Sequence, residues 1–182
     1  STRPDTIYGV TFLAISPNHQ LSINLSKTDE NIKLFLEKCK DLKTAEADIA
    51  KAEKLGIDTG KKVIHPITKE KLPVWIGNFV LLDYGTGVVM GVPGHDERDF
   101  EFATKYKINI KQVIKNDKDD LPISDKGILI NSDNFDGMTS EDASKEIINK
   151  LIELECGNSL IQFRLRDWGV SRQRYWGCPI PV

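Results

Sequence analysis

The chain has 182 residues, of which 40% are hydrophobic and 29% charged, with 13 glycines and 8 prolines. This composition predicts one well-cored globular domain and argues against disorder, and no apolar run approaches the roughly 18 residues of a membrane helix. A net charge of −2 and a pI near 5.9 argue against a free-standing nucleic-acid-binding protein, because such proteins present a basic face to phosphates.

The cysteines and the chain ends bear on the compartment and on the completeness of the chain. Cys39, Cys156 and Cys178 are odd in number and form no C-x-x-C pair, and the three histidines are scattered. We therefore expect reduced thiols in the cytoplasm, with neither a disulfide framework nor a zinc site. The first residues contain no initiator Met and no signal-peptide pattern, so we expect a fragment of a longer chain.

The first third of the sequence alternates between strand-like and helical patterns. Residues 6–15 are rich in β-branched and aromatic side chains and predict a strand that follows a turn at Arg3-Pro4-Asp5. Residues 31–38 and 46–55 have helical spacing, with Gly56 as a candidate C-terminal cap. We expect these helices at the periphery.

Short apolar runs then return and predict strands at residues 62–67, 72–76, 79–82 and 88–92. A helix is expected at residues 96–106, strands at 111–114 and near 127–130, a helix from Ser140 to Leu154 capped by Thr139 or Ser140, and a last strand at 160–165. Such closely spaced short strands suggest a β-barrel, which places the chain in the α+β class.

The stretch from Gly85 to Asp99 is typical of a small-molecule site, because it joins an apolar strand to a polar helix start. Gly85 and Gly87 allow a sharp turn, and Pro93-Gly94 breaks the chain before the helix. Asp96 is a candidate N-cap for that helix. Asp99 would lie at the rim of a cavity, where helix N–H groups should lower its pKa and suit it to hold an ammonium group.

Other candidates have a structural and a functional interpretation. Thr2, Arg3 and Thr6 form an ordinary turn with a solvated Arg, or, placed opposite Asp99, supply hydrogen bonds to an ester and a contact for phosphate.

Met90 and Val92 share one strand face and are either core or pocket lining. His95 and Tyr84 are equally ambiguous, and no nearby Ser or Cys makes His95 a general base for a nucleophile.

Three motifs together resemble the editing domain of leucyl-tRNA synthetase: residues 2–6, residues 85–99, and residues 166–181, which begin Arg-Asp-Trp-Gly-Val-Ser-Arg-Gln-Arg. The resemblance covers residues 1–182 as one domain, with about 166–182 as the segment returning to a class I catalytic domain. It implies a closed β-barrel decorated by helices, as in the related isoleucyl- and valyl-tRNA synthetase domains. Signatures of the catalytic domain are absent from the sequence, so neither ATP nor Mg²⁺ is expected here, and no other cofactor.

The resemblance implies hydrolysis of the ester that joins norvaline, isoleucine or methionine to the 3′-terminal adenosine of tRNA(Leu). It implies that Asp99 holds the substrate ammonium, that Thr6 crowds the leucine side chain, and that Thr2 and Arg3 position the ester and the adenosine. The lining implied is Ser1, Leu82, Tyr84, Met90, Val92, His95, Asp96 and Arg98. Ser1 departs from the family, which usually has a second threonine there. The expected partners are the acceptor end of tRNA(Leu) and the rest of a monomeric synthetase.

Three rival interpretations remain at this point. A hydrolase with an Asp96–Asp99 carboxylate dyad would act without tRNA, although helix-end lowering of both pKa values argues against a proton-donating acid. A binding module would hold the acceptor end without cleaving the ester. The third rival is an editing domain of isoleucyl- or valyl-tRNA synthetase.

Overall fold

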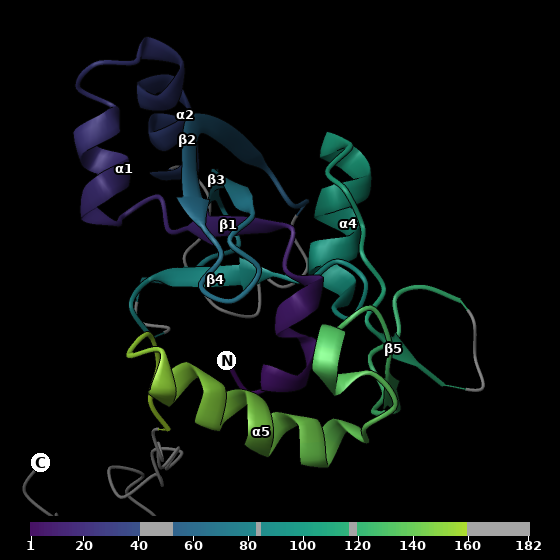
Figure 1. The fold of residues 1–182 in the computed structure, drawn as a ribbon. Coiled ribbons are helices and arrows are strands. Elements are labelled where there is room, and N and C mark those ends of the chain that lie inside the picture. Colours follow the sequence, from purple (N-terminus) through teal and green to yellow (C-terminus); the bar gives the residue numbers. More distant parts are fainter. Residues whose placement is uncertain (41–52, 83–84, 117–119, 160–182) are drawn as a thin grey trace, which may run out of the picture.

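The computed structural model describes residues 1–40, 53–82, 85–116 and 120–159. Outside these residues lie Tyr84, the predicted strand at 160–165, the C-terminal motif and Cys178. Most of the predicted helix at 46–55 also lies outside them, and its last residues, 53–55, are not helical. The described part is a mixed α/β structure in which helices surround a small sheet (Figure 1). Within it, no helix is long and apolar enough to span a membrane.

The central sheet has four strands in the order β2-β3-β1-β4. These are β1 (Phe12–Ile15), β2 (Gly56–Ile64), β3 (Lys71–Gly77) and β4 (Val88–Gly91). Strand β1 is parallel to β3, with Leu13 opposite Val74, and antiparallel to β4, with Leu13 opposite Met90. Strand β4 is therefore an edge strand among the described residues.

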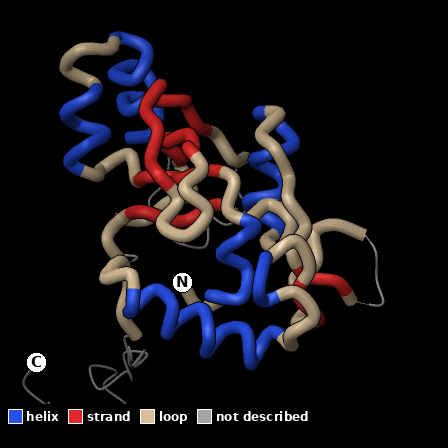
Figure 2. The backbone as a smooth tube through the Cα atoms, viewed as in Figure 1, coloured by secondary structure: helices blue, strands red, loops and turns tan. Residues whose placement is uncertain are grey.

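The predicted closed barrel is not found among the described residues. Both sides of β1 are occupied by β3 and β4. The next strands, β5 (Ile114–Lys115) and β6 (Ile128–Leu129), pair with each other and not with this sheet. Figure 2 shows these two groups of strands separated by loops. The short runs therefore form an open sheet and a separate two-stranded ladder, because sequence runs indicate strands but not their partners.

Helices α1 (Gln20–Leu25) and α2 (Glu30–Lys40) lie beside the β2 end of the sheet. Because α2 includes residues 31–38, the helix predicted there is confirmed. Helix α4 (Glu97–Tyr106) is also confirmed; it packs through Phe102 against Phe12 and Phe79, with ring centroids 5.3 and 5.1 Å apart. Helix α5 (Ser140–Glu153) is capped by Thr139, as predicted, and runs beneath the N-terminal segment.

Three predictions about apolar runs differ from the structure because tertiary packing overrides local propensity. The strand predicted at 111–114 begins only at Ile114, the first residue of β5. Residues 4–9 form a 3₁₀-helix, η1 (Pro4–Gly9), so the predicted strand begins only at Phe12. Residues 79–82 form no strand, and Phe79 and Val80 fill the core under α4 instead.

Gly56 is not a helix cap but the first residue of β2. A Cβ atom there would lie 2.6 Å from the Phe102 ring, so glycine is required for the close approach of α4. By contrast, Gly85 and Gly87 have φ values of +62° and +72°, which confirms the sharp turn predicted before β4.

Candidate active site

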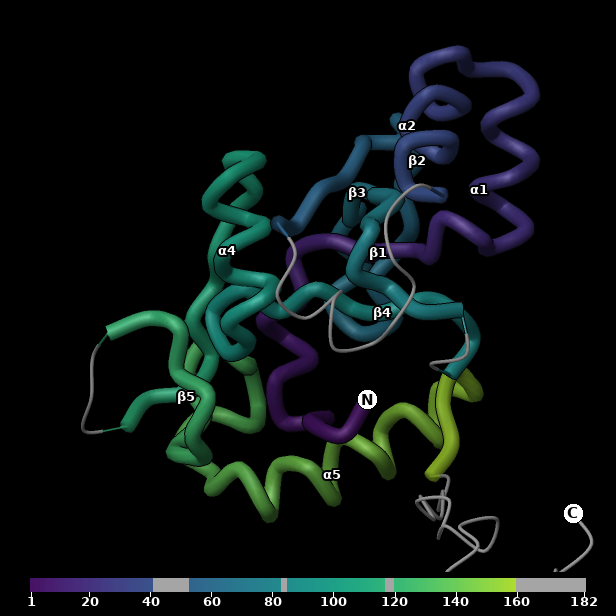
Figure 3. The backbone as a smooth tube through the Cα atoms, turned by 180° about the vertical axis from the view of Figure 1, so that it is seen from behind, coloured from purple at the N-terminus to yellow at the C-terminus, as the bar shows by residue number. Residues whose placement is uncertain are grey.

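A cavity of about 200 Å³ lies between the N-terminal turn and the junction of β4 with α4. Figure 3 shows, from behind, how closely the N-terminus approaches β4 although some ninety residues separate them in the chain. The cavity is lined by Ser1, Thr2, Arg3, Thr6, Val88, Val89, Met90, Val92, His95, Asp96, Arg98 and Asp99. The structure therefore brings together the two sequence motifs that were predicted to face each other.

The N-terminal wall is organised by hydrogen bonds to the backbone carbonyl of Arg3. The Thr6 hydroxyl donates to this carbonyl at 2.9 Å, and the Thr6 N–H donates to it at 3.2 Å. Thr6 is 3% exposed. Pro4 suits the first turn of this 3₁₀-helix because its fixed φ is already helical and its missing N–H is not needed there.

The opposite wall is the start of α4. Asp96 caps the helix, because its carboxylate accepts hydrogen bonds from the N–H groups of Arg98 and Asp99. The Asp99 carboxylate accepts the Val92 N–H at 2.8 Å instead of returning to the helix. Asp99 thereby joins β4's end to α4 at the cavity.

The predicted lowering of the Asp99 pKa is wrong. Asp99 is 5% exposed, and burial, reinforced by the negative charge of Asp96, raises its pKa to about 7. The Val92 N–H and Arg98 act in the opposite direction but do not compensate. Loss of hydration therefore outweighs the helix N-terminus, whose effect is a fraction of a kcal/mol to about 1 kcal/mol.

His95 uses both ring nitrogens for the backbone. Its Nδ1 lies 2.9 Å from the Ile123 carbonyl and its Nε2 accepts the Val113 N–H at 2.9 Å and the Ile114 N–H at 3.2 Å. This pattern requires a neutral ring protonated at Nδ1, and burial lowers the pKa of His95. Both lone-pair and N–H functions are occupied, so His95 is a structural connector at the cavity edge and not a general base.

Of the predicted site residues, ten lie around this cavity: Ser1, Thr2, Arg3, Thr6, Met90, Val92, His95, Asp96, Arg98 and Asp99. Leu82 does not line it and is 44% exposed in the turn before β4. Val88 and Val89 were not predicted. They line the cavity together with Met90, so three consecutive residues of β4 reach it. Alternation along the strand would have selected only every second one.

The structure bears on the Asp96–Asp99 dyad hydrolase in two opposite ways. Asp99 does carry the raised pKa that a proton donor needs. Asp96, however, is committed to the helix cap. The geometry alone leaves a cavity with one buried carboxylate facing a hydroxyl-rich turn.

Comparisons with known proteins decide the family. Residues 1–152 match the family described as "Leucyl-tRNA synthetase, editing domain". This chain belongs to that family. The whole chain aligns at 54% identity with the leucine–tRNA ligases of Hahella chejuensis and of Vesicomyosocius okutanii, and it spans 22% and 23% of their lengths. Identification as a leucyl-tRNA synthetase editing domain, not an isoleucyl or valyl one, is confirmed.

A solved structure agrees with this assignment to the leucyl-tRNA synthetase editing domains. The Agrobacterium radiobacter K84 agnB2 LeuRS, crystallised as a ternary complex with tRNA and LeuAMS, matches all of this chain and 20% of its own. The TM-score is 0.67 and the sequence identity 35%. The open sheet and surrounding helices are thus compatible with the family fold.

Proposed function

We propose that this chain hydrolyses the ester bond of mischarged tRNA(Leu), within a longer monomeric cytoplasmic synthetase. The observation that carries the proposal is the convergence of Thr2, Arg3 and Thr6 with Asp99 around one cavity. The substrates proposed are norvalyl-, isoleucyl- and methionyl-tRNA(Leu). Editing is needed because an apolar pocket distinguishes one methylene by only about 1–3 kcal/mol.

Asp99 is the proposed anchor for the substrate ammonium. An ammonium group beside a buried carboxylate stabilises the ionised form, so substrate binding would lower the raised pKa of Asp99. With a pKa of about 7 the carboxylate is only partly ionised at neutral pH, and the bound cation would shift it to the ionised form. This selects aminoacyl esters over neutral esters of similar size.

Thr6 is the proposed sieve against leucine. Its hydroxyl is held by the Arg3 carbonyl, so the side chain has one rotamer and presents a fixed shape to the cavity. A rigid wall rejects a γ-branched side chain more sharply than a mobile one would. The hydrolytic water, in this proposal, is held by backbone groups and by the free hydroxyl of the substrate ribose, without metal, ATP or other cofactor.

The test is deacylation of isoleucyl-tRNA(Leu) and leucyl-tRNA(Leu) by the full-length synthetase that carries this domain. The wild type should cleave only the isoleucyl ester, Asp99→Ala should lose at least about 100-fold in rate, and Thr6→Ala should begin to cleave the leucyl ester. Thr6→Val is the matched control, because it keeps the volume and loses only the hydroxyl. Cleavage of neither ester by the wild type would favour the acceptor-end binding module.

A further inference from the structure

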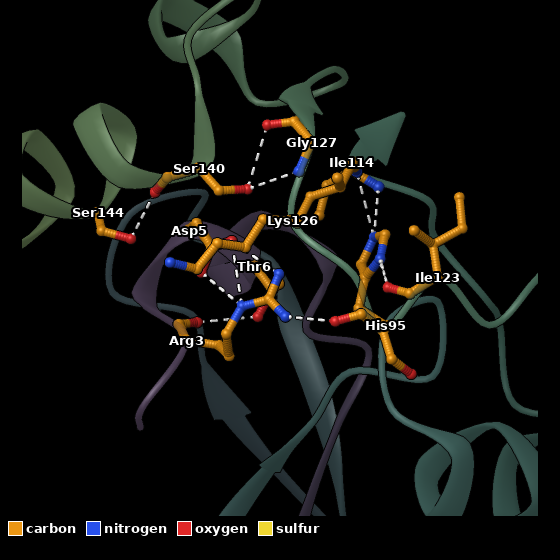
Figure 4. A network of polar contacts seen from close by, with 12 residues as sticks. Arg3, Asp5, Thr6, His95, Ile114, Ile123, Lys126, Gly127, Ser140 and Ser144 are labelled. Atoms are coloured by element: carbon orange, nitrogen blue, oxygen red, sulfur yellow. Dashed lines mark hydrogen bonds and ion pairs between the residues drawn. The ribbon is translucent and has the colours of Figure 1, made fainter. Parts of the chain in front are cut away.

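Ile123 and Ser124 connect the two walls of the cavity although neither lines it, and we call these two residues the brace. Ile123 donates its N–H to the Gly94 carbonyl at 2.9 Å, and its own carbonyl lies 2.9 Å from Nδ1 of His95. The Ser124 carbonyl accepts a hydrogen bond from Nη1 of Arg3 at 2.8 Å. The junction of β4 with α4 is thus tied to Ile123, through the His95 contact that Figure 4 shows. The N-terminal turn is tied to Ser124.

The Arg3 side chain reaches the brace because Asp5 holds it from the other side. Arg3 Nε donates to Oδ1 of Asp5 at 3.0 Å and Nη2 donates to Oδ2 at 2.9 Å. The Asp5 side chain is 2% exposed, whereas that of Arg3 is 28% exposed. This is the two-point pairing that the planar guanidinium forms best, and it leaves the group little freedom to rotate.

The guanidinium also keeps donors for a substrate. Three of its five N–H groups are used by Asp5 and Ser124, so two remain on a side chain that lines the cavity. Asp5 itself does not line the cavity, and it lies between Pro4 and Thr6 in what the sequence shows as an ordinary turn. Among the lining residues, the one to which its carboxylate is hydrogen-bonded is Arg3.

We propose that Asp5 is a positioning residue for editing: through Arg3 and the brace it sets the separation of Thr2 and Thr6 from Asp99. This inference rests on the proposed editing function. Without the carboxylate, Arg3 would return to the many rotamers of a free side chain, and the N-terminal turn would lose its connection to the opposite wall. Misplacement of about 1 Å is enough to slow a reaction about 100-fold.

The experiment measures single-turnover deacylation of isoleucyl-tRNA(Leu) by the full-length synthetase carrying Asp5→Asn, Arg3→Lys or both. Asp5→Asn should slow the chemical step about 10- to 100-fold while leaving the KM for tRNA within about twofold of the wild type. If Asp5 acts through Arg3, the double variant should be no slower than Arg3→Lys alone. Thermal unfolding is measured in parallel, and Glu141→Gln, which removes an exposed ion-pair partner of Lys126, is the control expected to change nothing.

A second pair of variants tests the brace itself should Asp5→Asn fail to fold. His95→Asn can still donate to the Ile123 carbonyl from the position of Nδ1, whereas His95→Gln places its amide near the position of Nε2 and loses that contact. His95→Asn should therefore deacylate about tenfold faster than His95→Gln. Equal rates would overturn the role of the brace.

The outcomes separate the two proposals. A wild-type enzyme that clears no mischarged ester would overturn the editing function, and the positioning role would fall with it. An active wild type with an unchanged Asp5→Asn rate, or with losses that multiply in the double variant, would overturn only the positioning role. A purely structural role would lower the melting temperature and leave the rate per folded molecule unchanged, which would equally overturn it.

Discussion

At the scale of single residues, Asp99 shows that a helix start does not by itself determine a carboxylate's pKa. Its neighbours in the sequence indicate an acidic group favoured by helix N–H groups, but the fold buries it beside Asp96. An ionised Asp99 carboxylate is unfavourable in this buried position unless a cation lies beside it. Such a carboxylate suits a site that must respond to an ammonium group. The same charge destabilises the domain when the site is empty.

We predict that Asp99→Asn stabilises the domain at pH 8 by roughly 2–4 kcal/mol. The folded-state pKa of about 7 lies above the ordinary value of 3.8, so the folded state binds the extra proton between these pH values. The stability that protonated Asp99 contributes to the wild type is fully present below about pH 4. It is lost as the pH rises through 7. Asn keeps an acceptor for the Val92 N–H but does not titrate.

Denaturant unfolding of both proteins from pH 4 to 8 measures this effect. The advantage of Asp99→Asn should grow from pH 4 to 7 and then remain constant. An advantage that is the same at every pH would mean that the Asp99 carboxylate is not the titrating group.

At the scale of secondary-structure elements, α4 carries one side of the site because its beginning is fixed by a cap and its middle by the aromatic core. The Asp96 cap orients the first turn, and Phe102 packs on Phe12 and Phe79. The cap could be predicted from its local sequence pattern. The aromatic contacts could not, because they depend on the fold.

We predict that Asp96→Ala lowers the free energy of unfolding by about 1 kcal/mol, whereas Asp96→Asn lowers it by a few tenths at most. An Asn side chain at this position can still accept the Arg98 and Asp99 N–H groups that Asp96 accepts. Asp96→Asn should also retain deacylation. Its complete inactivation would instead revive the carboxylate-dyad mechanism, so chemical denaturation and the editing assay should be run on the same samples.

At the scale of the whole molecule, two buried neutral histidines connect distant segments. His65 Nε2 lies 3.0 Å from the Ile7 carbonyl and holds η1 to the β2–β3 connection. His95 likewise holds the β4–α4 junction to β5, because its Nε2 accepts the Ile114 N–H. Burial lowers the pKa of both. Their contribution to stability is therefore complete above the ordinary pKa of about 6.5 and is lost as the pH falls below it through the lowered folded-state pKa values.

This predicts opposite pH trends from the histidines and Asp99 in the mildly acidic range. In an Asp99→Asn background, stability should fall steadily as the pH decreases from 7 to 5, more steeply than in the wild type. Adding His65→Gln should flatten that decrease, because the introduced glutamine does not titrate. An unchanged slope would show that His65 is not responsible.

We also expect the 182-residue chain alone to edit far more slowly than the full-length synthetase at low tRNA concentration. The net charge of −2 gives little attraction for phosphates, and the curated relatives are more than four times longer than the aligned chain. Comparing the two proteins across a range of tRNA concentrations measures this. Equal activity at the lowest concentration would contradict it.

The sequence by itself determined the features that depend on local chemistry. Helical spacing and capping residues located α4 and α5, and the glycine turn located the start of β4. The motifs also identified ten of the residues around the cavity, because the family resemblance supplied the opposing wall that spacing cannot show.

Tertiary structure decided what depends on partners distant in the chain. It placed Thr6 in a 3₁₀-helix instead of a strand, paired β5 with β6 instead of closing a barrel, and buried Asp99 deeply enough to raise its pKa. It also turned Asp5 from a turn residue into the partner that holds Arg3. Strand pairing and desolvation arise from surfaces that meet only after folding, so no local pattern encodes them.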